Sequence, residues 1–220
     1  MIVIFDLDGT VWDSEEGIVA SLQHTFESFD MAVPDRATMT ANLGPPLQLM
    51  LAELGIPADL VDEATLRYRE RYVERGVYEA QLYPGIADTL GALRSSGHRL
   101  ATATSKGERP TLQMVEHFGL AEHFEFVGAA SMDSSAITKE AVLARTLTAL
   151  GDPDPSGCWM VGDRSYDVTG SARHDIACIG VLWGYGTEDE LRAAGAAHLV
   201  REPAELLEIL GRAAGDPGLS

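Results

Sequence analysis

The chain has 220 residues and 45% hydrophobic content, enough to bury a substantial core, and we expect one α/β domain with an insertion. Its formal net charge of −18 at pH 7 argues against nucleic-acid binding, because polyanions would be repelled and no basic stretch offsets the charge. No apolar run approaches the roughly 20 residues of a membrane span, so we expect no membrane partner. Cys158 and Cys178 lie in apolar runs, which indicates buried thiols and favours a cytoplasmic protein.

The first predicted element is a short buried strand over residues 2–5, Ile-Val-Ile-Phe, which leads directly into residues 6–10, Asp-Leu-Asp-Gly-Thr. Ligands of α/β proteins collect beyond the carboxyl ends of parallel strands, so chemistry is expected at Asp6 and Asp8. Strand alternation places these two carboxylates on one side, with Leu7 opposite. Two anions so close together usually require a cation. The alternative is a strand that simply ends in an Asp-Gly turn.

The next segment, residues 14–79, is predicted to be an all-helical insertion. A helix is expected to start from Asp13 as its N-cap, because Glu16 follows three residues later and apolar side chains then recur at helical spacing. Further helical patterns occupy residues 46–54 and 58–75. No convincing strand pattern interrupts them, so the insertion is expected to contain helices only.

From residue 80 onward, strand and helix patterns alternate, which predicts a doubly wound parallel sheet. The expected strands lie near residues 100–103, 124–127, 158–161, 177–183 and 198–200, with a helix after each. Polar residues follow two of these strands. Thr104-Ser105-Lys106 comes after the first, and Gly162-Asp163-x-x-x-Asp167 comes after the third. Lys139 opens the helix that follows the second strand.

An acid pair, a hydroxyl, an amine and a second acid pair, in this order, resemble the four motifs of the haloacid dehalogenase (HAD) superfamily of phosphohydrolases. Residues 6–10 fit the first motif, Thr104 the second, Lys139 the third, and Gly162-Asp163-x-x-x-Asp167 the fourth. Residues 180–186, Gly-Val-Leu-Trp-Gly-Tyr-Gly, look like the branch that contains phosphoglycolate phosphatases and HAD-type 5′-nucleotidases. The resemblance covers nearly the whole chain.

The resemblance implies a domain organisation and an activity. Residues 1–13 and 80–220 are expected to form a HAD-like Rossmannoid core, and residues 14–79 a helical cap domain over the active site. The implied enzyme is a Mg²⁺-dependent phosphomonoester hydrolase of small metabolites, with phosphoglycolate or a nucleoside 5′-monophosphate as the preferred substrate. Two alternatives stay open: a phosphomutase of the β-phosphoglucomutase type, and a non-catalytic phosphate-binding regulatory protein on the same fold.

The four aspartates take their implied roles from the same resemblance. Asp6 is the expected nucleophile that forms an aspartyl-phosphate, and Asp8 the expected acid that protonates the leaving alcohol. Mg²⁺ would be held by Asp6, the backbone carbonyl of Asp8 and Asp163, with Asp167 orienting water around the metal. Electrostatics alone also requires a cation, because two unit charges at 4 Å repel by about 4 kcal/mol at an effective dielectric near 20.

Hydroxyl and amine groups are expected to bind the phosphoryl oxygens. The resemblance implies that Thr104 and Lys139 serve in catalysis, and that Thr104, Ser105 and Lys106 contact the substrate. A lone Lys at a helix start is more often a solvated surface residue, and Lys106 lies close enough to compete for the same role. The sequence therefore leaves open whether Lys139 or Lys106 neutralises the phosphoryl charge.

The cap is expected to choose the substrate. The loop that starts at Asn42 and runs through Gly-Pro-Pro resembles the family's specificity loop, so Asn42 and Gln48 are predicted to contact the leaving group. The alternative is a plain connector between two helices, since Gly-Pro often marks a turn. The only partner expected is a small-molecule phosphomonoester, bound by a monomer or a homodimer.

Overall fold

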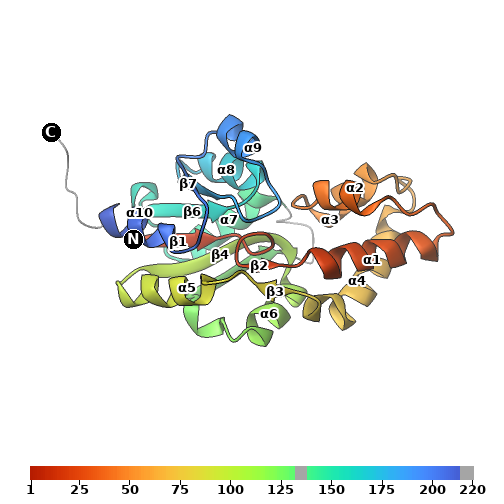
Figure 1. The fold of residues 1–220 in the computed structure, drawn as a ribbon, viewed down its shortest axis with the longest axis horizontal. Coiled ribbons are helices and arrows are strands. Elements are labelled where there is room, and N and C mark those ends of the chain that lie inside the picture. Colours follow the sequence, from red (N-terminus) through yellow and green to blue (C-terminus); the bar gives the residue numbers. More distant parts are fainter. Residues whose placement is uncertain (132–137, 214–220) are drawn as a thin grey trace.

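A parallel β-sheet forms the centre of the molecule in the computed structural model, which describes residues 1–131 and 138–213 (Figure 1). Within those residues, the strands of this sheet are paired in the order β5-β4-β1-β6-β7-β8, and every pairing is parallel. Their bounds are Ile2–Phe5 (β1), Arg99–Gly107 (β4), Phe126–Ala130 (β5), Cys158–Gly162 (β6), Ala177–Val181 (β7) and His198–Val200 (β8). The predicted α/β fold with a parallel sheet is confirmed.

Helices cover both faces of the sheet. They are α5 (Ile86–Ser95), α6 (Glu108–His117), α7 (Lys139–Ala149), α8 (Ser165–Ala172), α9 (Glu188–Ala194) and α10 (Glu205–Ala213). Val3 and Phe5 of β1 pack in one buried cluster with α5, α6 and α10, whereas Ile2 and Ile4 pack in a second cluster with α7, α8 and α9. Because β1 is buried on both faces, its sequence is a continuous apolar run, as expected for a central parallel strand.

The chain leaves and re-enters this region through a small antiparallel ribbon formed by β2 (Trp12–Asp13) and β3 (Gln81–Leu82), which no sequence pattern predicted. Between the two strands the chain is helical, as expected. The helices are α1 (Glu15–Ser28), α2 (Arg36–Ala41), α3 (Leu47–Glu53) and α4 (Val61–Glu74), followed by a 3₁₀ turn at Gly76–Tyr78. Figure 1 shows them grouped at one end of the molecule.

Residues 14–79 are called the helical insertion below, and residues 1–13 and 80–211 the sheet region. The short ribbon β2–β3 lies next to both expected boundaries, because its strands end at Asp13 and begin at Gln81. The interpretation of the helical insertion as a separate cap domain stays a prediction.

The first helix of the insertion starts one residue later than predicted. Ser14, not Asp13, is the N-cap residue of α1. The Asp13 carboxylate accepts the backbone N–H of Glu15 at 3.0 Å, whereas the Ser14 hydroxyl makes no bond to the helix and donates to Asp8 at 2.5 Å. The prediction of Asp13 as the N-cap residue was wrong by one position, although the Asp13 carboxylate still accepts the first N–H group of the helix.

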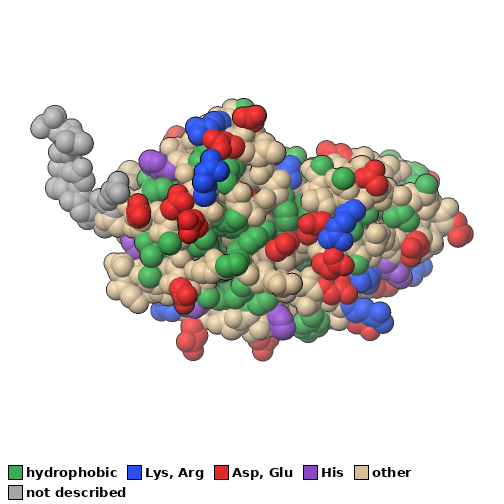
Figure 2. All heavy atoms as spheres, in the orientation of Figure 1, with side chains coloured by type: hydrophobic (Ala, Val, Ile, Leu, Met, Phe, Trp, Pro, Cys, Tyr) green, Lys and Arg blue, Asp and Glu red, His purple; other side chains and the backbone are tan. Residues whose placement is uncertain are grey.

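Both cysteines are buried free thiols, as predicted. Acidic side chains are scattered over both the sheet region and the helical insertion on the face shown in Figure 2, in line with the formal charge of −18. Among the described helices, none is long and apolar enough to cross a membrane.

Candidate active site

A cavity of about 600 Å³ lies where the carboxyl ends of β1 and β4 face the helical insertion. Side chains from both parts of the molecule line it. Six of the residues predicted from the sequence are among them: Asp6, Asp8, Thr104, Ser105, Lys106 and Gln48. The cavity is therefore the candidate active site, at the edge of the sheet where α/β proteins bind ligands.

The first acid pair is arranged as strand alternation predicts. Asp6 and Asp8 both line the cavity, and Leu7 between them is fully buried in the hydrophobic core. Register explains the position, because Phe5 pairs with Thr102 on one side and with Val161 on the other. The residues that follow these three strands therefore meet at one edge of the sheet.

Lys139 lies beside Asp6, although 133 positions separate them in the sequence. Its Nζ atom is 2.7 Å from Oδ1 of Asp6 and 2.8 Å from Oδ1 of Asp167, and it donates to the carbonyl of Ala103 at 2.8 Å. Lys139 is only 6% exposed, which excludes a solvated surface residue. Burial alone would lower the pKa of this ammonium, but the carboxylates of Asp167 and Asp6 raise it above its ordinary value.

Three buried carboxylates lie together here, and two of them, Asp6 and Asp167, contact this ammonium. Asp163 follows β6, and Asp167 lies in the first turn of α8. Asp6, Asp163 and Asp167 each offer an oxygen atom within 4.8 Å of the others. Burial, followed by repulsion from Asp167, raises the pKa of Asp6 to about 6 despite the ion pair with Lys139. Burial, Asp167 and Asp6 also raise the pKa of Asp163 well above its ordinary value.

This donor set fits a divalent cation. One ammonium cannot compensate three carboxylates, and carboxylate oxygens are the ligands that Mg²⁺ prefers in proteins. Asp163 also keeps an oxygen fixed, because Oδ2 accepts the backbone N–H of Tyr185 at 2.8 Å. The turn at Gly9 packs directly on this carboxylate: φ is +80° there, and a Cβ atom would lie 2.3 Å from Oδ2 of Asp163. Only glycine suits that position.

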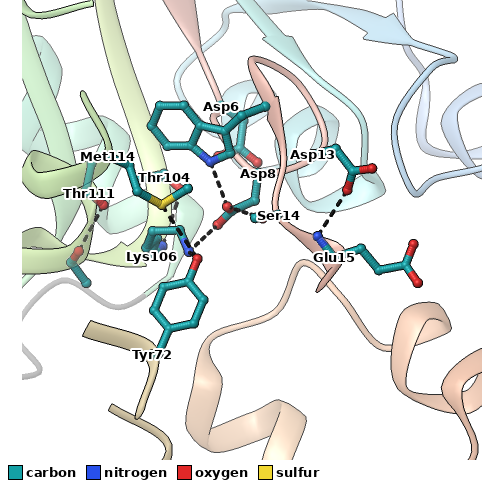
Figure 3. Close-up of polar contacts among 12 residues, drawn as sticks. Asp6, Asp8, Asp13, Ser14, Glu15, Tyr72, Thr104, Lys106, Thr111 and Met114 are labelled. Carbon is teal, nitrogen blue, oxygen red and sulfur yellow. Dashed lines mark hydrogen bonds and ion pairs between the residues drawn. The ribbon is translucent and has the colours of Figure 1, made fainter. Parts of the chain in front are cut away.

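Asp8 has different surroundings from the three buried acids. Its Oδ1 atom accepts from Nε1 of Trp12 at 2.9 Å and from Oγ of Ser14 at 2.5 Å, and its Oδ2 atom lies 3.1 Å from Nζ of Lys106 (Figure 3). The Asp8 carboxylate is therefore held by neutral donors and a second ammonium, outside the three-acid cluster. Each lysine thus pairs with a different acid of the first motif: Lys139 with Asp6, and Lys106 with Asp8.

Thr104 and Ser105 stand where β4 becomes irregular. The pairing of β4 with β5 shifts register between Thr104 and Gly107, and such bulges often re-aim side chains next to active sites. The Thr104 hydroxyl is buried and accepts the backbone N–H of Lys106 at 3.3 Å. Thr104, Ser105 and Lys106 all line the cavity that Asp6 and Asp8 also line.

The two residues predicted from the insertion lie in different places. Gln48, in α3, lines the cavity. Asn42 is not among the described lining residues, because its side-chain amide donates to the carbonyl of Thr38 at 2.8 Å and so closes the end of α2. The loop between them still meets the sheet region, since Gly44 packs against the Arg164 side chain.

Sequence reasoning missed four side chains that shape the site: Trp12, Ser14, Tyr72 and Tyr185. Tyr72 lies in α4, one turn after Tyr68, and the two rings stack with centroids 5.4 Å apart. Two tyrosines at i and i+4 on an otherwise charged helix were the available signal. The Tyr185 hydroxyl accepts the backbone N–H of Ser14, so the loop after β7 contacts the entrance to the insertion.

Comparison with known proteins places this chain in a family. A model of the haloacid dehalogenase-like hydrolases matches residues 3–181. The chain is 43% identical over 188 residues to the tyrosine-protein kinase PtkA of Mycobacterium tuberculosis, covering 86% of this chain but only 64% of the length of PtkA. It is 36% identical over 209 residues to a 5′-nucleotidase of Pseudomonas aeruginosa, with 94% of each chain covered.

Solved structures agree with the sequence comparisons. A predicted phosphatase from Clostridium acetobutylicum superposes with a TM-score of 0.91 at 34% identity, covering 96% of this chain and 98% of that one. The predictions of this superfamily and of its fold are confirmed, and the relatives include proteins named as phosphatases. The chain belongs to the haloacid dehalogenase-like hydrolase family.

Proposed function

We propose that this protein is a Mg²⁺-dependent phosphomonoester hydrolase of small metabolites that works through an aspartyl-phosphate on Asp6. The observation that carries the proposal is the position of Asp6. Its carboxylate lines the cavity, pairs with the buried ammonium of Lys139 and lies beside Asp163 and Asp167. A nucleophile, a counter-charge and a set of oxygen ligands therefore stand together at one point.

Asp6 would attack the phosphorus atom in line with the departing alcohol, which splits hydrolysis into two easier displacements. The approach of a carboxylate to a phosphate is opposed by about 4 kcal/mol per unit-charge pair at 4 Å and an effective dielectric near 20. Lys139, 2.7 Å from Asp6, offsets part of that repulsion and keeps the nucleophile ionised. Thr104 and the backbone N–H groups near Ser105 would bind the phosphoryl oxygens.

The metal would be held by Asp6, Asp163 and the backbone carbonyl of Asp8, with Asp167 close by. When bound, Mg²⁺ would supply the positive charge that three buried carboxylates and a phosphate together require. Asp167 also orients Lys139, because the two groups are 2.8 Å apart. Loss of Asp167 should therefore affect the ammonium as well as the metal.

Asp8 would protonate the leaving alcohol and later accept a proton from the water that hydrolyses the aspartyl-phosphate. This role is supported by its separation from the three-acid cluster and by the donors that fix it. Trp12 and Ser14 hold one oxygen, and Lys106 faces the other. The carboxylate therefore has a defined orientation next to the space that the leaving group would occupy.

Cavity size and lining favour a leaving group larger than the two carbons of glycolate. The cavity measures about 600 Å³, within the range of sites for drug-sized ligands. Leu47, Met50 and Val73 of the insertion supply apolar wall, and Gln48 adds an amide. We therefore favour a nucleoside 5′-monophosphate over phosphoglycolate.

A phosphomonoester panel with 5′-nucleotides, sugar phosphates and phosphoglycolate tests the proposal. The wild-type protein should release inorganic phosphate with Mg²⁺ and not in chelator. Asp6→Asn should abolish release, since an amide is a poor nucleophile, while Asp59→Asn, the same change at an exposed residue of the insertion, should not. A phosphate-labelled ester quenched in acid should leave its label on the peptide that contains Asp6. Transfer without phosphate release would indicate a mutase, and binding without turnover a regulatory protein.

A further inference from the structure

A short series of polar contacts links the helical insertion to Asp8 (Figure 3). Nζ of Lys106 lies 3.1 Å from Oδ2 of Asp8 and donates to the Tyr72 hydroxyl at 2.5 Å. That hydroxyl donates in turn to Sδ of Met114 at 3.6 Å. Asp8 follows β1 and Lys106 lies near the end of β4, both in the sheet region, whereas Tyr72 belongs to α4. The contact between Lys106 and Tyr72 therefore crosses from one region to the other.

Burial makes this crossing contact important for the ammonium. The Lys106 side chain is 7% exposed and Tyr72 is 2% exposed, so both groups have lost most of their contact with bulk water. A buried ammonium needs polar acceptors, and lysine can reach them in several directions through its flexible stem. Among the described residues, its side-chain acceptors are Asp8 and Tyr72, and the Tyr72 ring also lies 4.1 Å from Nζ.

The two oxygens of Asp8 depend on different parts of the protein. Oδ1 is held by Trp12 and Ser14, which come four and six residues after Asp8 in the chain. Among the described side chains, only Lys106 contacts Oδ2, and Lys106 is itself held by Tyr72. If Tyr72 lost its hydroxyl or moved away with α4, the ammonium would lose one of its two acceptors, and the partner of Asp8 Oδ2 would no longer be held in place.

We propose that Tyr72 is a positioning residue that couples the packing of the helical insertion on the sheet region to the orientation of Asp8, acting through Lys106. This inference rests on the proposed function, in which Asp8 gives its proton to the leaving oxygen as the P–O bond breaks. That proton transfer is then efficient only when α4 lies against the sheet region. Acid catalysis by Asp8 would then occur only while the helical insertion is packed against the sheet region and bulk water is excluded from the cavity.

Two esters of similar size separate this role from simple binding. Benzyl phosphate releases an alkyl alcohol and needs a proton from Asp8, whereas 4-nitrophenyl phosphate releases a stable phenolate and needs almost none. Tyr72→Phe should lower kcat/KM for benzyl phosphate by about tenfold and for 4-nitrophenyl phosphate by less than about threefold, because only the first reaction depends on general acid catalysis. The parameter kcat/KM covers the steps up to departure of the leaving group.

Tyr68→Phe is the matched control. It removes the same atom one helical turn earlier, from a ring that stacks on Tyr72, and among the described residues the Tyr68 hydroxyl takes no part in the contacts of Lys106 with Asp8 and Tyr72. The ratio of the two kcat/KM values should be unchanged in this variant. Lys106→Met should change the ratio as Tyr72→Phe does, and the double variant should be no worse than the poorer single one, since both act on one contact series.

Several results would overturn the coupling. An equal loss on both esters in Tyr72→Phe would indicate a binding or structural role, and additive effects in the double variant would indicate independent roles. A ratio that shifts equally in Tyr68→Phe would point to packing of the ring. The wild-type protein and Asp6→Asn serve as the separate check of the proposed function. If wild type hydrolyses both esters, Asp6→Asn hydrolyses neither and the ratio in Tyr72→Phe is unchanged, only the coupling fails.

Discussion

Without a bound cation, the buried acids should make this protein less stable as the pH rises. The pKa of Asp6 is about 6 in the folded protein, against an ordinary value of 3.8 in an unfolded chain. Between these pH values the unfolded chain has released its proton while the folded protein retains it. The unfolded state then binds fewer protons, so the free energy of unfolding falls with increasing pH and the loss is complete above about pH 6.

The size of this loss follows from the shift. About two pKa units correspond to about 3 kcal/mol for Asp6 alone. Asp163 acts in the same direction, because burial and its acidic neighbours raise its pKa as well. Lys139 stays protonated in both states across this range and adds nothing to the slope. A cation that binds the ionised carboxylates should reverse the loss, so Mg²⁺ should stabilise the protein most at neutral pH.

Urea unfolding at about pH 4.5 and about pH 7.5, each in chelator and in Mg²⁺, measures the effect. Surface carboxylates with lowered pKa values, such as Glu188 beside Arg192, give the opposite slope, so the informative quantity is the difference from a matched variant. Asp163→Asn is that variant, because an amide oxygen can still accept the backbone N–H of Tyr185. It should be more stable than wild type in chelator at about pH 7.5 and gain little from Mg²⁺.

A different outcome would refute the reasoning. If Mg²⁺ stabilised wild type equally at both pH values, its binding would not depend on ionisation of these buried carboxylates. If Asp163→Asn in chelator were less stable than wild type at about pH 7.5, the repulsion among the acids would be smaller than the hydrogen bonds that Asp163 makes. The first result would mean that the metal site lies elsewhere.

Three further predictions concern single side chains. Gly9→Ala should abolish the stabilisation of the protein by Mg²⁺, because the added Cβ atom would lie 2.3 Å from a carboxylate oxygen of Asp163. Thermal unfolding with and without Mg²⁺ measures this, and an increase in melting temperature equal to that of wild type would contradict it. Lys139→Met should lower kcat by about 100-fold or more, because no ammonium would then neutralise the negative charge of the phosphoryl group. Retention of most activity in a phosphate-release assay would exclude this role of Lys139. Gln48→Ala should alter the ranking of kcat/KM among phosphomonoesters, whereas Asn42→Ala should lower the melting temperature and leave the ranking intact. The reverse pattern would indicate that Asn42, and not Gln48, contacts the leaving group.

The sheet and its acids could be predicted because backbone geometry alone determines where they lie. A continuous apolar run of four residues indicates a strand buried on both faces, and the next residues must emerge at its carboxyl end. Alternation then decides that Asp6 and Asp8 share a side and that Leu7 does not. The same reasoning applies to Asp163 after β6. None of these inferences depends on how a helix packs.

Positions on the helical insertion depend on packing and could not be predicted in the same way. Periodicity identifies the buried face of a helix, but not the surface against which that face packs. Gln48 and Asn42 looked equivalent in the sequence, yet one lines the cavity and the other closes its own helix. The contact of Tyr72 with Lys106 could not be predicted either, because it exists only once α4 packs against the sheet region.

The local rule that failed is also informative about the site. A serine at the start of a helix normally bonds to the free backbone N–H groups of the first turn, and this contributes about 1 kcal/mol to stability. Ser14 instead donates to Asp8, and the carboxylate of Asp13 takes the first free N–H group of α1. Departures of this kind are expected at functional sites, where a tertiary contact replaces a local one. Because Ser14 is the first residue of the insertion, its bond ties the start of α1 to the acid that the proposed reaction requires.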